Sequence, residues 1–277
     1  MHADCHIHMV FDGVDWKNAI ARHQPAPHIP WIRDTLKHYR SLGITYLRDG
    51  GDRWGVSAAA RELAPEYGIT YRTPLSPLCK ASHYGAFLGE TYDDTKSYVN
   101  LVKKQKALGA DFIKIMISGL VDFNQFGVLS EDPLSKEEIR ELIHIAHAEG
   151  MAVMAHANGA RCMENAAAAG AESIEHGYYG DADAFAAMAD NGTVWVPTLS
   201  TAANLRGTGR HPEAELQKIL DCALQAVADF AGHIAPGTDA GAFAVPHGAP
   251  TEAPLLQSAG VSPARIQSGI LEIQKLF

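Results

Sequence analysis

The sequence predicts an α/β fold of the (β/α)8 TIM-barrel type, with eight parallel strands and eight helices in one domain over residues 1–277. The first observation is that short β-rich segments alternate with helical patterns from end to end, which implies a parallel sheet that eight units can close into a barrel. The second is that no linker or low-complexity segment interrupts this alternation. The third is that glycine stands just before a strand at positions 43, 109, 150, 170 and 192. The length also fits one barrel of about 250 residues.

The expected elements follow one another in a regular order. Strands are expected near 3–9, 44–49, 68–73, 111–117, 151–156, 172–176, 193–199 and 234–239. Helices are expected near 29–42, 56–66, 92–109, 135–149, 159–169, 181–191, 212–232 and 250–260. The helix near 135–149 is the clearest, because Ser135 and Glu138 have the spacing of a capping box and Gly150 provides a left-handed stop.

Composition excludes several classes of protein. Lysine and arginine number 23 against 32 acidic residues, and a net charge of −9 argues against a general binder of nucleic acid or anionic membranes. A hydrophobic content of 47% allows a sizeable core, and the apolar runs are too short to span a bilayer. The four cysteines lie far apart in the sequence, which indicates reduced thiols and not a disulfide scaffold. The start of the chain does not resemble a signal peptide. We therefore expect a cytoplasmic protein, and a homo-oligomer is compatible with the sequence.

The first candidate ligands are His6 and His8. Two residues apart in a strand, their side chains point to the same face, so the two imidazoles form a potential chelate for a metal ion. The alternative is a pair of hydrogen-bonded core histidines. The three-residue pattern alone does not decide between these interpretations.

Lys114 is the second unusual residue, because it lies within the apolar strand DFIKIMI. A buried lysine needs a partner, and an ammonium cannot bind a metal. Desolvation lowers the pKa of the amine, however, and a neutral amine can react with carbon dioxide to give a carbamate with two oxygens. The alternative is an ion pair with a nearby carboxylate.

Three further residues lie where other expected strands end. His156 ends the fifth strand, His176 the sixth and Asp239 the eighth. Each alone could be a core or capping residue. In a (β/α)8 barrel, however, the carboxyl ends of the strands meet at one face, and this face carries the active site. The joint pattern therefore predicts one site at this face, formed by side chains from several strands.

With these residues in place, the sequence resembles the amidohydrolase superfamily of metal-dependent hydrolases, in its binuclear, carboxylated-lysine form. That pattern has HxH on strand 1, lysine on strand 4, histidine on strands 5 and 6, and aspartate on strand 8. The sequence is most similar to the branch of imidazolonepropionase-like and prolidase or Xaa-Arg dipeptidase-like enzymes. Its recurring segments are GITYLRDGG, GADFIKIM, AHANGA, SIEHG, VPTL and GTDAG, and the resemblance extends from about residue 4 to residue 248.

The resemblance implies two divalent metal ions, for which nitrogen and oxygen ligands favour Zn²⁺ while leaving manganese, iron and cobalt open. The implied ligands are His6, His8, Lys114, His156, His176 and Asp239. A hydroxide and the carboxylated Lys114 would bridge the ions, and Asp239 would act as general base and then general acid. The implied reaction is cleavage of a C–N bond in an amide, dipeptide, N-acyl amino acid or cyclic amide.

Four other residues are candidates for contact with a small-molecule substrate. His83 and Tyr84 lie in the long loop after the third strand, where catalytic-face loops often carry function. Tyr178 follows His176, and packing beneath the loops is an equal alternative for it. His247 lies in VPHG, one loop after Asp239, and resembles a PHG element of the same branch. We interpret Arg48 and Asp49 as a structural ion pair at a strand end.

Two other functions stay open. A phosphotriesterase or lactonase-type hydrolase uses the same ligand set, although the SIEHG and VPTL segments favour the amidohydrolase branch. The second alternative is a non-catalytic metal-binding barrel. It is motivated by the β-sandwich that members of the branch usually build from segments on either side of the barrel. This sequence starts at the first strand and ends at LEIQKLF, so we expect a barrel without the accessory β-sandwich. The intact set of ligands argues against a non-catalytic protein.

Overall fold

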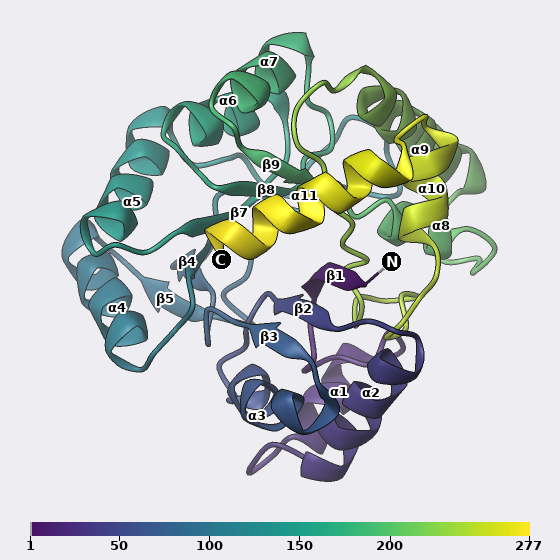
Figure 1. Ribbon diagram of the computed structural model, residues 1–277. Helices are drawn as coiled ribbons and strands as arrows, with labels where there is room; N and C mark the ends of the chain where they lie inside the picture. Colours follow the sequence, from purple (N-terminus) through teal and green to yellow (C-terminus); the bar gives the residue numbers. More distant parts are fainter. Residues whose placement is uncertain (1) are drawn as a thin grey trace.

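The computed structural model describes residues 2–277 and shows an α/β fold with parallel strands (Figure 1). One sheet has the order β1–β2–β3, and the other has the order β5–β4–β6–β7–β8–β9. The strands of the first sheet are β1 (Ala3–Ile7), β2 (Tyr46–Asp49) and β3 (Thr70–Arg72). Those of the second are β4 (Leu78–Lys80), β5 (Glu90–Tyr92), β6 (Ile113–Met116), β7 (Val153–Ala157), β8 (Ser173–His176) and β9 (Val194–Val196).

Backbone hydrogen bonds connect the two sheets on both sides. On one side, the Asp111 amide, just before β6, donates to the Thr73 carbonyl, just after β3 (3.0 Å). On the other side, the segment 234–240 lies between β9 and β1. Its Ala235 amide donates to Trp195 of β9 (2.9 Å), and the Cys5 amide of β1 donates to its Pro236 carbonyl (2.9 Å). The carboxyl ends of β1, β6, β7 and β8 therefore face the same region.

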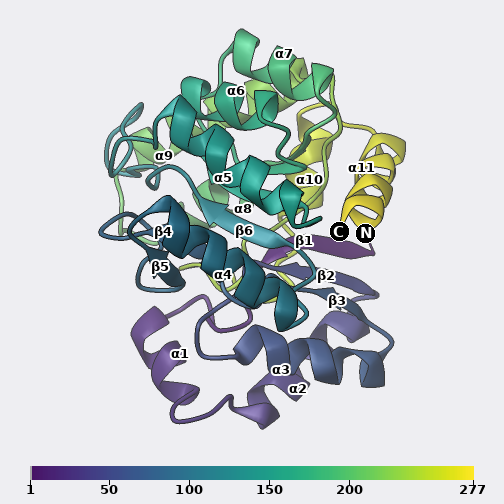
Figure 2. The ribbon, with the colours of Figure 1, turned by 90° about the vertical axis from the view of Figure 1, so that its left-hand side faces the viewer.

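Helices follow most strands and lie outside the sheets (Figures 1 and 2). Their bounds are α1 (Trp16–Arg22), α2 (Ile29–Ser41), α3 (Val56–Leu63), α4 (Thr95–Ala107), α5 (Lys136–Ala148), α6 (Ala160–Ala168), α7 (Ala182–Asp190), α8 (Ser200–Leu205), α9 (Glu213–Asp229), α10 (Glu252–Ser258) and α11 (Pro263–Leu276), with a 3₁₀ turn, η1 (Ala64–Tyr67). The predicted capping box of α5 is confirmed: Ser135 and Glu138 each accept a backbone N–H of the other. Its buried face is Ile139, Leu142, Ile143 and Ala146.

Helix α11 crosses the ends at which the strands begin (Figures 1 and 2). It packs against β1 and β9, and a Cβ atom built on Gly269 would lie 1.8 Å from the Ile234 carbonyl oxygen. Only glycine allows so close an approach of helix and sheet. The ring of Phe277, the residue after α11, lies edge-to-face against Phe112 at 5.1 Å. This end of the fold is therefore covered by apolar packing.

Several elements differ from the sequence-based expectations. The segment 234–239 forms only isolated bridges, because Asp239 has a left-handed φ of 59° and the Pro236–Gly237 pair interrupts a regular strand. Strands β4 and β5 and helices α1, α8 and α11 were not expected. Within the described residues, no helix is long and apolar enough to cross a membrane. The cytoplasmic location and the homo-oligomer stay predictions.

Candidate active site

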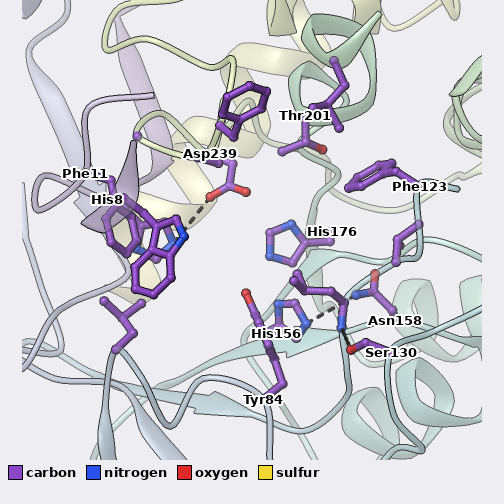
Figure 3. Close-up of a pocket in the computed structure, with 18 of the residues that line it drawn as sticks. His8, Phe11, Tyr84, Phe123, Ser130, His156, Asn158, His176, Thr201 and Asp239 are labelled. Carbon is purple, nitrogen blue, oxygen red and sulfur yellow. Dashed lines mark hydrogen bonds and ion pairs between the residues drawn. The ribbon is translucent and has the colours of Figure 1, made fainter. Parts of the chain in front are cut away.

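A cavity of about 890 Å³ opens where the carboxyl ends of the strands meet (Figure 3). All six side chains that the sequence analysis grouped as metal ligands line it. We refer to these six as the polar floor: His6, His8, Lys114, His156, His176 and Asp239. They come from β1 and the residue that follows it, from β6, β7 and β8, and from the segment after β9, so residues up to 233 positions apart in sequence share one surface.

His6, His8 and Asp239 form the tightest group on the polar floor. The Nε2 atoms of His6 and His8 lie 3.5 Å and 3.4 Å from Asp239 Oδ1. One potential ligand atom from each residue lies within 4.8 Å of the others. His6 Nε2 and His8 Nδ1 are buried and have no hydrogen-bond partner among residues 2–277. Unsatisfied buried nitrogen atoms are costly, so this arrangement is suited to a bound cation.

A buried network behind the floor fixes the orientation of His6. Its Nδ1 lies 2.5 Å from Glu175 Oε2, and the other oxygen of Glu175 accepts from Arg48 Nη2 (2.8 Å) and from the Ser173 hydroxyl (2.6 Å). A carboxylate on Nδ1 keeps the proton there and directs the Nε2 lone pair into the cavity. The expected ion pair between Arg48 and Asp49 is wrong, because Arg48 points to Glu175 across the fold.

Asp49 instead accepts hydrogen bonds from the Tyr71 hydroxyl (2.6 Å) and from the backbone amides of Met9 (2.8 Å) and Gly51 (2.6 Å). The Met9 amide directly follows His8 in the chain. Asp49 therefore fixes the turn that carries His8, and its role is structural as expected although its partners differ.

His156 and His176 lie beside this group on neighbouring strands, where Ala157 pairs with His176. Each uses one ring nitrogen in the protein. His156 Nε2 lies 3.1 Å from the Gly119 carbonyl, and His176 Nδ1 lies 2.7 Å from Thr198 Oγ1. Their other nitrogens, Nδ1 and Nε2, remain available to the cavity. The His176 ring centroid is 4.6 Å from that of His156 and 4.9 Å from that of His6.

Two floor residues also have strained backbone. His176 has φ 68° and Asp239 has φ 59°, both in the left-handed region that residues other than glycine rarely occupy. Such conformations cost about 1–3 kcal/mol and persist where the surrounding structure enforces them, often at functional sites. Both side chains line the cavity.

Lys114 lines the same cavity and is buried, with 1% of its surface exposed. Its Nζ has no hydrogen-bond partner among the described residues, so the alternative of a lysine paired with a carboxylate finds no support in the geometry. Burial lowers the pKa of Lys114 to about 8, against the opposing effect of the Glu175 charge. An appreciable fraction of the amine is therefore neutral near pH 8, as reaction with carbon dioxide requires.

Burial in the polar floor lowers the pKa values of the four histidines and raises the pKa of Asp239. Burial lowers the pKa of His8 and of His156 to about 3, with a smaller contribution from the Lys114 charge, and lowers those of His6 and His176 well below the usual value. Burial raises the pKa of Asp239 to about 7. Neutral imidazoles are the form that binds metal ions.

Glycines next to the floor leave room for its rings. A Cβ atom built on Gly50 would lie 2.4 Å from His8 Cε1, and one on Gly237 would lie 2.7 Å from His6 Cβ. Glycine at position 50 therefore leaves room for the His8 ring, and glycine at position 237 leaves room for Val196 and His6.

The four expected substrate contacts divide into two groups. Tyr84 and Tyr178 line the cavity, and Figure 3 shows the Tyr84 hydroxyl directed into it beside His156. His83 and His247 are outside the lining. His247 is buried, with Nδ1 3.0 Å from the Tyr39 hydroxyl and Nε2 2.9 Å from the Phe11 carbonyl, so both nitrogens are engaged within the protein. His83 lies 3.5 Å from Glu131, whose carboxylate also accepts the Tyr84 amide (2.7 Å).

Sequence reasoning missed Glu175 and the groups that form the cavity wall. The charged Glu175 within the apolar strand SIEHG was an available signal, of the same kind that singled out Lys114. These other cavity-lining residues gave no such signal, because they lie on loops and short helices without a regular hydrophobic pattern. They are Phe11, Trp16, Phe87, Phe123, Asn158, Thr201, Arg210, His211 and Phe243.

Comparisons with known proteins agree with this architecture. Among curated proteins, ochratoxinase of Aspergillus niger is 30% identical over 201 residues, which cover 67% of this chain and 38% of that protein. The chain thus spans well under half the length of this relative. A solved Xaa-Pro dipeptidase with bound methionine superposes with a TM-score of 0.76 at 23% identity, covering 99% of this chain and 74% of that chain.

The solved structure of A. niger ochratoxinase superposes with a TM-score of 0.73 at 22% identity, covering 99% of this chain and 69% of that chain. At these identities the superpositions establish the α/β fold alone. The family assignment comes from the sequence: residues 43–244, which make up most of the chain, match the family model described as Amidohydrolase family. This chain belongs to the amidohydrolase family.

Proposed function

We propose that this protein is a metal-dependent amidohydrolase that cleaves a C–N bond in a small amide, on a (β/α)8 barrel closed through the segment 234–240. The observation that carries the proposal is the polar floor, where six side chains of metal-ligand type converge on one cavity. Three of them, His6, His8 and Lys114, have buried polar atoms that find no partner in the part of the chain that the structure describes. Members of the amidohydrolase family are generally metal-dependent, which supports the same conclusion.

The residues present fit a pair of divalent metal ions. His6, His8 and Asp239 would hold one ion, since their donor atoms already lie within 4.8 Å of one another. His156 and His176 would hold the other through the nitrogens that the protein leaves free. Lys114, carboxylated on Nζ, would supply oxygen atoms to both. When bound, such ions acidify water and polarise a carbonyl, and the nitrogen-rich ligand set favours Zn²⁺.

Asp239 is the residue that we assign to proton transfer. Its carboxylate accepts the proton of the attacking water and donates it to the departing amide nitrogen, so that an amine leaves rather than an amide anion. Before an ion binds, burial raises the pKa of Asp239 to about 7, so this carboxyl group can both hold and release a proton near neutral pH. The left-handed backbone at Asp239 keeps its side chain directed toward the cavity.

The cavity also suggests the class of amide. Tyr84 directs a hydroxyl into it, which suits a hydrogen bond to a substrate oxygen. Arg210 lines its mouth and forms no ion pair among the described residues, although its guanidinium lies over the Phe243 ring at 4.1 Å. A free guanidinium matches a carboxylate. A dipeptide or N-acyl amino acid fits both features, and the dipeptidase named among the structural relatives acts on a bond of this type.

The test is metal content per chain, measured by plasma mass spectrometry after growth with zinc and bicarbonate. We expect nearly two ions in the wild type and a sharp decrease in Lys114→Ala. Lys104→Ala is the matched control, because Lys104 is an exposed lysine on α4 that pairs only with Glu90. A folded wild-type protein with almost no metal would contradict the proposal and favour a non-catalytic barrel.

Activity is then measured on a panel of dipeptides and N-acyl amino acids, with a lactone and an aryl phosphotriester as competitors. Hydrolysis of the amides, absent from the metal-free protein, is the expected result. Preference for the lactone or the phosphotriester would favour the second type of hydrolase that uses this ligand set.

A further inference from the structure

The mouth of the cavity is unusually apolar for a surface exposed to water. Large hydrophobic side chains that are exposed in the described chain include Val14, Trp16, Phe87, Leu120 and Phe243, and all five line this one cavity. Exposed apolar side chains that gather around a concave site, rather than lying singly, mark a surface that binds an apolar group.

One side of this mouth is built from aromatic rings. We define the aromatic wall as Phe11, Trp16, Tyr84 and Phe87. Phe87 is its centre: its ring centroid lies 5.5 Å from Trp16, 6.2 Å from Tyr84 and 6.5 Å from Phe11. These separations and the tilts between the rings are those of interacting aromatic pairs.

The aromatic wall is continuous with the polar floor. The Phe11 ring lies 5.8 Å from His8, and the Tyr84 ring lies 4.9 Å from His156 (Figure 3). A group held against the wall therefore reaches the cavity residues to which we assign the chemistry. Because these centroids are less than 6 Å apart, a substituent that contacts the aromatic wall can belong to the same substrate whose amide lies at the polar floor.

The two most exposed members of the wall have little part in the core. Trp16 is 47% exposed and Phe87 is 41% exposed. Helix α1 is anchored by Ala19 and Ile20, its buried residues, and not by Trp16. The exposed ring surfaces of Trp16 and Phe87 are thus available to a ligand without any loss of internal packing.

We propose that the aromatic wall selects substrates that carry an aromatic ring next to the scissile amide, with Trp16 and Phe87 as the specificity-determining residues. This inference rests on the proposed amidohydrolase function and adds the substrate class to it. Ring faces of the substrate would complete the cluster around Phe87, and water would be released from the exposed faces of both residues. A small aliphatic substituent would leave these faces exposed and gain nothing from them.

The experiment compares kcat/KM for two pairs of substrates that differ in one aromatic ring. The pairs are N-acetyl-L-phenylalanine with N-acetyl-L-alanine, and N-benzoylglycine with N-acetylglycine. They are measured with the wild type, Trp16→Ala, Phe87→Ala and the double variant. Leu271→Ala is the matched control, since Leu271 is 56% exposed but lies on α11, away from the cavity.

In the wild type, we expect at least one pair to favour the aromatic member by tenfold or more. This ratio should fall severalfold in each single variant and approach one in the double variant, while Leu271→Ala keeps the wild-type ratio. A ratio near one in the wild type, or a ratio that the double variant leaves unchanged, would overturn the inference.

A binding measurement separates this inference from the proposed function. Isothermal titration of 2-naphthoylglycine and N-acetylglycine requires no turnover. Tighter binding of the naphthoyl compound, lost in the double variant, supports the wall even if no amide is hydrolysed; equal weak binding of both compounds contradicts it. Sedimentation of the same proteins tests the competing occupant: a wild-type dimer that becomes monomeric in the double variant, with unchanged selectivity, would make the wall an interface between copies.

Discussion

The polar floor and the aromatic wall share one cavity but are held in opposite ways. The floor residues are buried, and other groups fix their orientation from behind, as Glu175 does for His6 and Thr198 does for His176. The wall residues Trp16 and Phe87 are nearly half exposed, and within the described residues no hydrogen bond fixes their rings. The difference indicates that the positions of reacting groups are fixed tightly, whereas the surface that receives the substrate tolerates change. Substitutions behind the floor should therefore affect stability and metal retention, and substitutions at the rim should affect substrate affinity alone.

The largest effect is expected from Arg48→Met. The change leaves the charge of Glu175 buried without its guanidinium partner, and breaking a buried pair in this way costs about 3–5 kcal/mol. It also frees the carboxylate that orients His6, so we expect metal retention after dialysis to fall together with stability. Urea unfolding gives the free energy of unfolding, and plasma mass spectrometry gives the metal content.

Arg33→Met provides the matched comparison, because Arg33 pairs with Glu66 on the surface. An exposed pair contributes about 1 kcal/mol or less. The double variant Arg48→Met with Glu175→Gln should recover part of the lost stability, since it removes the unpaired charge. Equal losses in Arg48→Met and Arg33→Met would remove the distinction between the floor and the surface.

Gly50→Ala should affect the floor with a smaller loss of stability. The new methyl group would lie 2.4 Å from His8 Cε1, so the imidazole must move away from Asp239. Misplacement of a reacting group by about 1 Å can cost 100-fold in rate. We expect a decrease of this order in kcat/KM, with weaker metal retention and an unchanged circular dichroism spectrum.

Gly43→Asn is the control for a glycine substitution, because nothing lies within 4 Å of a Cβ atom at this position and asparagine tolerates its left-handed φ of 76°. This variant should keep both metal and activity. If Gly50→Ala retained the wild-type metal content and rate, His8 would not be required in its observed position.

The smallest effect is expected from Arg210→Ala at the rim. Loss of an exposed charge contact to a substrate carboxylate should raise KM about tenfold, which corresponds to about 1.4 kcal/mol, and change kcat by less than twofold. For a substrate that has a carboxamide in place of the carboxylate, we expect the variant and the wild type to have the same KM. An equal rise in KM for the charged and the neutral substrate would show that Arg210 does not recognise the carboxylate.

Local patterns in the sequence predicted those parts of the fold that depend on neighbouring residues. The capping box and apolar face of α5 are set within four residues, and the expected helix near 135–149 agrees with Lys136–Ala148. The polar residues His156 and His176, expected at adjacent strand ends, lie on the paired strands β7 and β8. Period, capping and strand order were sufficient for these features.

Contacts between distant residues could not be predicted in this way. Arg48 and Glu175 are 127 positions apart, and nothing near Arg48 in the sequence distinguishes that partner from the adjacent Asp49. The role of His247 was likewise hidden, because its partners Tyr39 and Phe11 lie more than 200 positions away. For the candidate site, the sequence predicted the floor residues and one member of the aromatic wall, Tyr84, but not the groups that support the floor or the other members of the wall.

The position of Phe277 has a consequence for the order in which the protein can assemble. Its ring lies 4.5 Å from the Arg48 guanidinium, which binds Glu175, which in turn orients His6. His6 thus depends on a residue that is synthesised 271 positions later. Strands β1 and β2 emerge from the ribosome long before α11 is synthesised. In the nascent protein, Arg48 of β2 therefore lacks its contact with the Phe277 ring. Metal loading is accordingly expected after translation of this segment, as a late step of folding.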